Sequence, residues 1–317
     1  MGRTAKGKRA DLSGRILVGV DGGGTKTLVA LSDEQGNEWI RRSGPAGLVD
    51  PRNPAAAAEV VASVVREAVR DAGITGAPAV LCAGLAGVGN RAEREAVRAA
   101  LLAAGVAERV EVVTDGETAL EGALDGGAGV LLIAGTGSVA YARGSDGRLE
   151  RCGGWGMVVG DEGSGFAIGR AGLVAALRAV DGRGDATRLL PLFLELLGVD
   201  DARGIPPWAG RAAKSEIAAL ASHVIRAAEG GDEVALRIVA TEARALAEHA
   251  VALRGRLESW AGEVPVVFHG GVLGTALYSD LVRRALVDAD PVFRVVPPVA
   301  DAVAGALRFA RALLVPA

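Results

Sequence analysis

The chain has 317 residues, 50% of them hydrophobic and 23% charged, which fits one large or two medium globular domains and argues against a disordered chain. Lys and Arg number 35 against 38 Asp and Glu, and the net charge of -3 argues against a general nucleic-acid binder. Two cysteines and three histidines are too few for a zinc module or a disulfide framework. Glycine is the outlier, because its 46 residues gather in a few tight clusters.

The first half of the chain predicts the element order βββαβαβ from short apolar runs separated by turn residues. The strands are expected over 15–20, 27–31, 38–42, 79–83 and 109–114. One helix is expected between Pro54 and Gly73, and a second between a capping box at Asn90 and Glu93 and a stop at Gly105.

The second half of the chain begins with the same pattern of apolar strand, glycine-and-threonine turn and apolar strand. We expect strands over 129–134, 139–143, 148–151, 264–268 and 292–296, and helices over 165–180, 215–229, 233–256, 276–287 and 300–314. We interpret the repeated order as an internal duplication that gives two similar α/β lobes with a cleft between them.

The expected domain organisation has four parts. Residues 1–14 are a flexible basic tail, 15–118 the N-terminal lobe, 119–300 the C-terminal lobe, and 301–317 a C-terminal helix that packs back toward the N-terminal lobe. The chain shows neither a signal-peptide core nor a membrane-spanning run. We therefore expect a cytoplasmic protein without membrane or nucleic-acid partners, and a homodimer.

The first glycine cluster runs from Asp21 to Thr27 and is predicted to hold phosphate. Glycine allows close approach of the backbone, and successive N–H groups there form an anion-binding nest. The candidate phosphate contacts are Gly23, Gly24, Thr25, Lys26 and Thr27. Asp21, at the end of a strand, suits a Mg²⁺ ion held partly through water. The alternative is a plain hairpin turn.

The second glycine cluster stands at the equivalent turn of the second half, and its candidate phosphate contacts are Gly135, Thr136, Gly137 and Ser138. Asp115 lies between the two clusters in sequence and directly follows a strand. A carboxylate there can accept a hydroxyl proton as a general base. The alternative is that Asp115 caps the helix that follows it.

Two further clusters follow. Cys152–Ser164 places Gly154, Trp155 and Asp161 together, and such a flat apolar wall beside glycines and carboxylates suits a sugar. The alternative here is a buried tryptophan with Asp161 as a helix cap. Gly270 and Gly271 follow a strand and would let an adenosine lie flat against the backbone, while we interpret the preceding His269 as a packing residue.

At these four clusters the chain resembles the BadF/BadG/BcrA/BcrD ATPase group, which includes N-acetylglucosamine kinases and belongs to the actin-like ATPase superfamily of sugar kinases. The resemblance runs from about Ile16 to the C-terminal helix. It implies an α/β fold of two actin-like, ribonuclease H-like lobes, each with a βββαβαβ core, around a central cleft.

The resemblance also implies roles for particular residues. Asp115 takes the catalytic-base position, Thr136 a place near phosphate and sugar, and Trp155 and Asp161 places at the sugar. It implies an ATP- and Mg²⁺-dependent kinase acting on the 6-hydroxyl of N-acetylglucosamine or a close relative, with glucosamine or N-acetylmuramic acid as alternatives. Val139 and Gly47 stand where many relatives carry asparagines that touch the sugar, so the identity of the sugar stays open.

A function of another class is an ATPase that activates a partner enzyme, since members of the same group energise electron transfer through a shared iron–sulfur cluster. That role requires clustered cysteine ligands. Cys82 and Cys152 are the only cysteines, and each stands in an apolar or glycine-rich setting. The sequence therefore favours the kinase.

Overall fold

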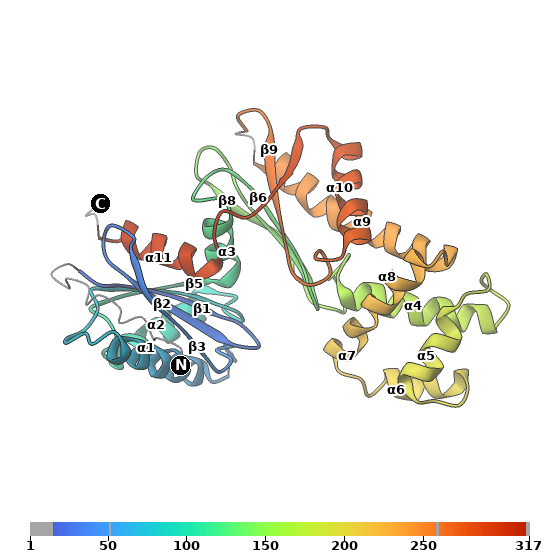
Figure 1. Ribbon diagram of the computed structural model, residues 1–317, viewed down its shortest axis with the longest axis horizontal. Helices are drawn as coiled ribbons and strands as arrows, with labels where there is room; N and C mark the ends of the chain where they lie inside the picture. The colour runs from blue at the N-terminus through green and yellow to red at the C-terminus, as the bar shows by residue number, and fades with distance from the viewer. Residues whose placement is uncertain (1–14, 51, 258–259, 315–317) are drawn as a thin grey trace, which may run out of the picture. The chain divides into compact units, whose positions relative to one another are not determined.

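The computed structural model describes residues 15–50, 52–257 and 260–314 (Figure 1). The predicted tail 1–14 lies outside the described residues. The chain forms two compact units, the first made of residues up to Gly126 together with those from Pro298 on, and the second made of Gly127–Pro297. The second unit is thus an insertion into the first.

The first unit is built on a five-stranded sheet in the order β3-β2-β1-β4-β5. Its strands are β1 (Leu17–Gly22), β2 (Thr27–Ser32), β3 (Glu38–Gly44), β4 (Val80–Leu85) and β5 (Arg109–Thr114). The first three strands form the expected antiparallel meander, whereas β4 runs parallel to β1 and β5 parallel to β4. The carboxyl ends of β1, β4 and β5 therefore meet at one edge of the sheet.

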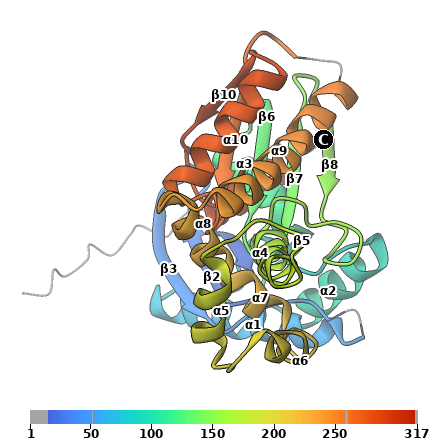
Figure 2. The same cartoon turned by 90° about the vertical axis from the view of Figure 1, so that its right-hand side faces the viewer.

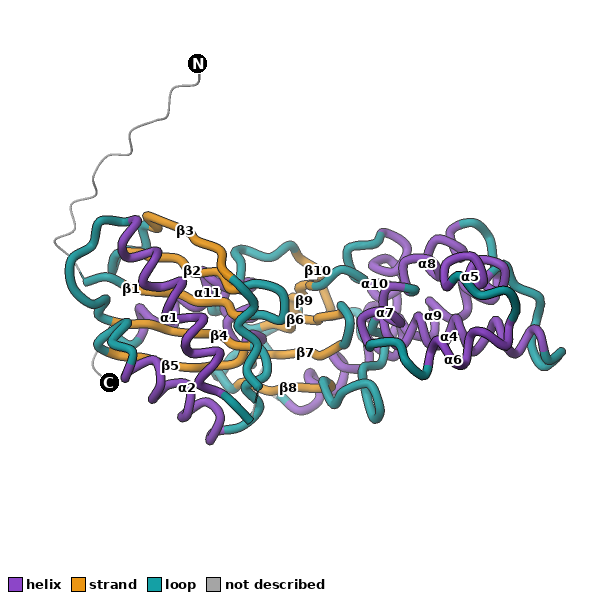
Figure 3. The backbone as a smooth tube through the Cα atoms, turned by 90° about the horizontal axis from the view of Figure 1, so that it is seen from below, coloured by secondary structure: helices purple, strands orange, loops and turns teal. Residues whose placement is uncertain are grey.

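Helices cover both faces of this sheet because its central strands are apolar on both sides. The helices are α1 (Pro54–Asp71), α2 (Arg91–Ala103), α3 (Asp115–Ala123) and α11 (Ala302–Ala312). Val18 and Val20 of β1 belong to the same core as the valines of α1, while Leu17 packs with Val303 and Leu307 of α11. Alternate residues of one strand thus serve two cores, and α11 lies across the sheet from α1 and α2 (Figures 1 and 3).

The second unit repeats the strand order. Its sheet reads β8-β7-β6-β9-β10, with β6 (Gly129–Ala134), β7 (Ser138–Arg143), β8 (Leu149–Gly153), β9 (Val264–His269) and β10 (Phe293–Val296). The strands β6, β7 and β8 form the antiparallel meander, and β9 and β10 are parallel to β6 and β9. The duplication predicted from the sequence is therefore confirmed strand by strand.

The helices of the second unit go beyond the prediction. They are α4 (Gly165–Val180), α5 (Leu189–Leu197), the 3-10 turn η1 (Ala202–Gly204), α6 (Ile205–Ala209), α7 (Lys214–Ala219), α8 (Ala221–Glu229), α9 (Glu233–Arg256) and α10 (Ala276–Ala289). The single helix expected over 215–229 is wrong, because the structure has two helices there, α7 and α8, separated at Leu220. The short helices α5 and α6 were not predicted, since their apolar and proline-rich sequences carry no clear helical period.

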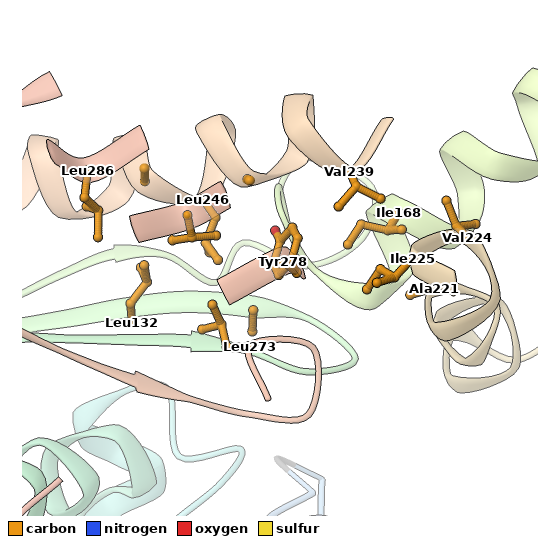
Figure 4. Close-up of a cluster of buried hydrophobic side chains, with 14 of the residues drawn as sticks. Leu132, Ile168, Ala221, Val224, Ile225, Val239, Leu246, Leu273, Tyr278 and Leu286 are labelled. Atoms are coloured by element: carbon orange, nitrogen blue, oxygen red, sulfur yellow. The ribbon is translucent and has the colours of Figure 1, made fainter. Parts of the chain in front are cut away.

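The core of the second unit joins the sheet to these helices. Helices α9 and α10 lie over the sheet (Figure 2), and α4 to α8 gather at one end of it (Figure 3). Ile168, Val224, Leu246 and Tyr278 come from four different helices and pack in one buried cluster (Figure 4). This cluster fixes the helices that carry the polar side chains described below.

The boundary between the units differs from the expected one at residue 118. Helix α3 belongs to the first unit and packs against α11, with a glycine of each helix at the contact. A Cβ atom at Gly305 would lie 2.0 Å from the carbonyl oxygen of Thr118, and one at Gly122 2.0 Å from that of Asp301. Helix α11 thereby completes the face of the first sheet.

Candidate functional site

The candidate residues of the first unit gather at the carboxyl edge of its sheet. The register aligns Gly22 of β1 with Leu85 of β4, and Leu85 with Thr114 of β5. Asp21 and Asp115 therefore stand at the ends of strands that are separated only by β4, at about 10 Å between strand axes by the usual sheet spacing. The edges of open α/β sheets formed by carboxyl ends are where such folds bind ligands.

The first glycine turn joins β1 to β2 and is open to solvent. Its one internal backbone bond runs from the N–H of Gly23 to the carbonyl of Lys26, at 3.0 Å. Gly24, Thr25 and Lys26 are exposed, and a Cβ atom at Gly24 would meet nothing within 4 Å. The turn therefore presents backbone N–H groups with little covering structure.

Thr27, the residue that ends this turn, is fully buried. Its hydroxyl has no hydrogen-bond partner among the described residues, and a Cβ atom at Gly47 would lie 2.6 Å from it. Gly47 in turn donates from its N–H to the carbonyl of Gly23 at 3.2 Å. The loop after β3 thus packs directly against the first glycine turn.

Asp115 is the first residue of α3, and the cap of that helix is its neighbour Thr114. The Thr114 hydroxyl accepts from the N–H of Glu117 at 3.1 Å, and the Glu117 carboxylate accepts from the N–H of Thr114 at 2.6 Å. The alternative that Asp115 serves as the helix cap is therefore wrong. Its half-buried carboxylate accepts from the N–H of Gly116 at 2.9 Å, at the positive end of the α3 dipole.

The second glycine turn, between β6 and β7, is held on several sides. The N–H of Gly135 donates to the carbonyl of Gly137 at 2.9 Å, and the N–H of Gly165, the first residue of α4, donates to the carbonyl of Gly135 at 2.8 Å. Gly270 adopts a φ of +99°, and a Cβ atom there would lie 2.4 Å from the carbonyl oxygen of Ala134. The strand end that carries the fourth cluster can approach the second turn only because this residue is glycine.

Asp161 lies beside this second turn and is 3% exposed. Its Oδ2 is 2.6 Å from Nζ of Lys214 on α7, and its Oδ1 accepts from the N–H of Ser138 at 3.3 Å. Its φ of +64° is unusual for a residue with a side chain and marks a strained position. The cap of α4 is Ser164, so the alternative that Asp161 caps this helix is wrong.

Trp155 is 71% exposed, so the alternative of a buried tryptophan is also wrong. The guanidinium of Arg151 lies 5.3 Å from the centre of its ring, within the range of a cation–π contact. Val158 and Val159, which follow it between β8 and α4, are exposed as well. The segment thus offers an apolar face with a flat ring, while Gly154 beside it adopts a φ of +72°.

The geometry of the segment next to Asp161 depends on α9 and α10. The N–H of Gly163 donates to Glu242 of α9 at 2.8 Å, and the carbonyl of Gly163 accepts from the hydroxyl of Tyr278 of α10 at 2.6 Å. Glu162 faces His249 of α9, with Oε2 3.8 Å from Nε2. Burial raises the pKa of Glu242 and that of Tyr278. Two helices therefore hold the chain next to Asp161.

A pocket of about 470 Å³ opens beside the second turn. It brings the second and fourth clusters together, since Gly135, Thr136 and Gly271 all line it. Its other walls come from α7, α8 and the loop before α10, with the residues Ser215, Ala218, Ala219, Ala221, Ser222, Ile225, Val272 and Thr275. Small and hydroxyl-bearing side chains leave room for a flat heterocycle and supply donors and acceptors around it.

The comparisons with known proteins agree with this arrangement. The model of the BadF/BadG/BcrA/BcrD ATPase family matches residues 18–310. The chain belongs to this family. The N-acetylmuramic acid/N-acetylglucosamine kinase of Clostridium acetobutylicum is similar to it, with 30% identity over 94% of this chain and 98% of its own length. The N-acetyl-D-glucosamine kinase of Dictyostelium discoideum is 27% identical over 93% of this chain and 97% of its own.

A crystal structure from Chromobacterium violaceum, assigned as an N-acetylglucosamine kinase, has the same fold. It superposes with a TM-score of 0.76 at 31% identity and covers 94% of this chain and 99% of its own. Membership of this ATPase family implies the use of ATP. The two sheets and the order of their strands are therefore those of the actin-like sugar-kinase fold.

The residues of the site are suited to hold a nucleotide and a Mg²⁺ ion. The pocket beside Gly135 and Gly271 fits a nucleoside, and the second turn next to it fits the phosphates. No group of three metal-ligating side chains exists within the described ranges. The half-buried carboxylate of Asp21 suits Mg²⁺ all the same, because this ion takes one or two carboxylates and completes its shell with phosphate oxygens and water.

Some residues of this site could not be predicted from the sequence. The pocket residues Ser215, Ser222 and Thr275 belong to no recognisable motif, and Lys214 is a lone lysine at the start of a short helix. Their positions depend on how α7 and α8 fold back on the sheet, which a single sequence does not reveal. The interpretation of His269 as a packing residue is wrong, since the side chain is exposed at the end of β9.

No helix in the described part of the chain is long and apolar enough to cross a bilayer.

Proposed function

We propose that the chain is an ATP-dependent amino-sugar kinase that transfers the γ-phosphoryl group of ATP to the 6-hydroxyl of N-acetylglucosamine or a close relative. The pocket that unites the second and fourth glycine clusters carries this proposal, because it would hold a nucleoside directly beside the second glycine turn. The kinase names of the full-length relatives support the same activity.

The nucleotide would bind with its adenosine between Gly271 and helices α7 and α8. Backbone N–H groups and hydroxyls of Gly135–Ser138 would receive its phosphates, and the first turn, with Gly23, Gly24, Thr25, Lys26 and Thr27, would meet the transferred group. Asp21 would hold Mg²⁺, which neutralises phosphate charge when bound.

The sugar would use Gly154, Trp155, Thr136 and Asp161, with its 6-hydroxyl at Asp115. The flat face of Trp155 suits the apolar side of a pyranose, and the carboxylate of Asp161 suits two sugar hydroxyls as donors. These residue roles are predictions.

The reaction needs little covalent help from the protein. Asp115 would accept the proton of the 6-hydroxyl as its oxygen forms the new bond to the γ-phosphorus. The bond from that phosphorus to the β,γ-bridging oxygen breaks, and ADP leaves with the electron pair. Positioning and charge stabilisation supply most of the rate in such transfers.

The test is the turnover of Mg·ATP by the purified chain with N-acetylglucosamine, glucosamine, N-acetylmuramic acid or no sugar. We expect ADP release that depends on an amino sugar, with a sugar phosphate as product. Sugar-independent ATP hydrolysis as the only reaction would refute the kinase assignment. Omission of Mg²⁺ should abolish turnover. The cytoplasmic location and the homodimer stay predictions, the second open to sedimentation measurements.

A further inference from the structure

The distribution of lysine in this chain is unusual. Only four of its 35 basic residues are lysines, at positions 6, 8, 26 and 214, and the others are arginines. Two of the four lie in the described residues, Lys26 within the first glycine turn and Lys214 beside the second. A chain that uses arginine almost everywhere thus has a lysine at each of its two candidate phosphate sites.

Lys214 stands directly over the second turn. A Cβ atom at Gly137 would lie 2.9 Å from its Nζ and 2.7 Å from Oδ1 of Asp161, so both charged groups contact this turn. The ammonium is paired with Asp161 at 2.6 Å, yet the lysine side chain remains 33% exposed while that of Asp161 is 4% exposed. The cation therefore has an open side, whereas the carboxylate does not.

Helix α7 links this ion pair to the nucleotide pocket. Lys214 is its first residue, and the next residue, Ser215, lines the pocket together with Ala218 and Ala219. Phosphates attached to a nucleoside in that pocket would extend along Gly135–Gly137, which is the surface that the ammonium faces. Lysine suits such a position because its compact ammonium group lies at the end of a flexible side chain and can change partners. The planar guanidinium of arginine is less suited to such an exchange.

We propose that Lys214 exchanges partners when a nucleoside triphosphate binds. Its ammonium leaves Asp161 for a phosphate oxygen at the second turn, and Asp161 becomes available to sugar hydroxyls. A buried carboxylate left without donors is costly, so hydroxyl donors from the sugar stabilise the exchanged state. The two ligands consequently strengthen each other's binding by a reciprocal factor. This inference rests on the proposed function, because it names the link between its two substrate sites.

The decisive experiment measures binding without turnover. Calorimetry with the non-hydrolysable analogue AMPPNP and with adenosine alone would be run on the wild type and on Lys214→Met. We expect the variant to bind AMPPNP about ten- to a hundredfold more weakly, because one hydrogen bond to a charged group typically contributes that much to affinity. Its affinity for adenosine should be unchanged. Arg211→Met is the matched control, since it removes an exposed positive charge just before α7 and should alter neither ligand.

A second variant tests the exchange itself. Asp161→Asn removes the competing anion, so AMPPNP should bind more tightly than to the wild type, and Lys214→Met in the same chain should cancel that gain. In the wild type, AMPPNP should raise the affinity for N-acetylglucosamine, and in Lys214→Met this coupling should disappear. Thermal melting of each variant verifies that it is folded.

The outcomes separate the two proposals. Equal AMPPNP affinity in folded Lys214→Met and wild type would overturn the exchange and leave the kinase intact. Equal losses for AMPPNP and adenosine would also overturn it, because Lys214 would then merely support the pocket. Failure of the wild type to bind either nucleotide would instead refute the proposed function.

Discussion

The two glycine turns occupy equivalent positions in two sheets of the same strand order, yet their surroundings differ. Residues 24–26 of the first turn are exposed, and one backbone bond closes it. The second turn is backed by α4 and by the side chains of Asp161 and Lys214. The difference arises from the long helical segment between β8 and β9, where the first unit has only α1 between β3 and β4.

This contrast teaches that a duplicated β framework can place equivalent glycine turns in very different surroundings. The second turn is held by its surroundings, and such preorganisation would lower the entropic cost of binding a nucleotide there. The first turn carries fewer contacts and can adjust to a transferred group. Chemistry and nucleotide binding are then expected to divide between the units, and the following predictions test that division.

The largest effect is expected from Asp115→Asn in the first unit. Loss of a general base typically costs ~10²–10⁴-fold in rate, or roughly 3–5 kcal/mol of barrier. Because Thr114 caps α3, the amide should leave folding and sugar affinity nearly unchanged. Steady-state sugar phosphorylation measures the effect, with Glu111→Gln on the same strand as the control. Retention of more than about a tenth of wild-type turnover would remove Asp115 from this role, since it falls below the range for a general base.

A pair of glycine substitutions compares the turns directly. In Gly137→Ala the new methyl group meets the atoms of Asp161 and Lys214, and such overpacking typically costs roughly 1–3 kcal/mol. Gly24→Ala has open space around it and should cost little. Melting temperatures and AMPPNP affinities of both variants give the measurement. Similar losses at both positions would contradict the view that only the second turn is held rigidly.

Thr27→Val probes the buried hydroxyl of the first unit. Replacement of an unpaired buried hydroxyl by a methyl group of similar shape is nearly neutral or stabilising for the fold. If this hydroxyl donates to phosphate once the turn adjusts, the variant should melt no earlier than the wild type while its KM for ATP rises several-fold. Thr27→Ser should keep the KM. An unchanged KM in Thr27→Val would show that the hydroxyl has no part in binding.

The smallest effect concerns pH and the second unit. Since burial raises the pKa of Glu242 above its usual value of 4.5, the folded chain binds this proton more tightly than the unfolded chain. The resulting stability is fully present below pH 4.5 and is lost as pH rises through the raised value. The melting temperature of Glu242→Gln relative to wild type should therefore increase from pH 4 to pH 7. Glu248→Gln, on the exposed side of α9, is the control. A difference that stays constant with pH would contradict this account.

Much of the fold could be predicted from the sequence because its signals are local. The capping box at Asn90 and Glu93 and the repeated pattern of strands and glycine turns all correspond to observed elements. The duplication was visible because each half places a glycine turn between two apolar strands. Asp21 and Asp115 come at the ends of predicted strands, and because these strands are parallel to β4 both residues lie at one edge of the sheet.

The remainder depended on tertiary contacts. Whether Thr114 or Asp115 caps α3 follows from one reciprocal pair of hydrogen bonds, and both residue types are favoured at an N-cap. The break between α7 and α8 places Lys214 and Ser215 near residues more than 50 positions earlier. The exposure of Trp155 likewise depends on a loop that no helical or strand period describes.

Helix α11 closes the first unit although it is synthesised after the whole second unit. A Cβ atom at Gly19 would lie 2.6 Å from the carbonyl oxygen of Val303, so β1 is shaped to receive a helix made long after it. On the ribosome, β1 to β5 emerge first, and the whole of Gly127–Pro297 is translated before α11. Leu17 and Cys82 remain uncovered until α11 appears. The nascent first sheet therefore keeps one apolar face uncovered until the end of synthesis.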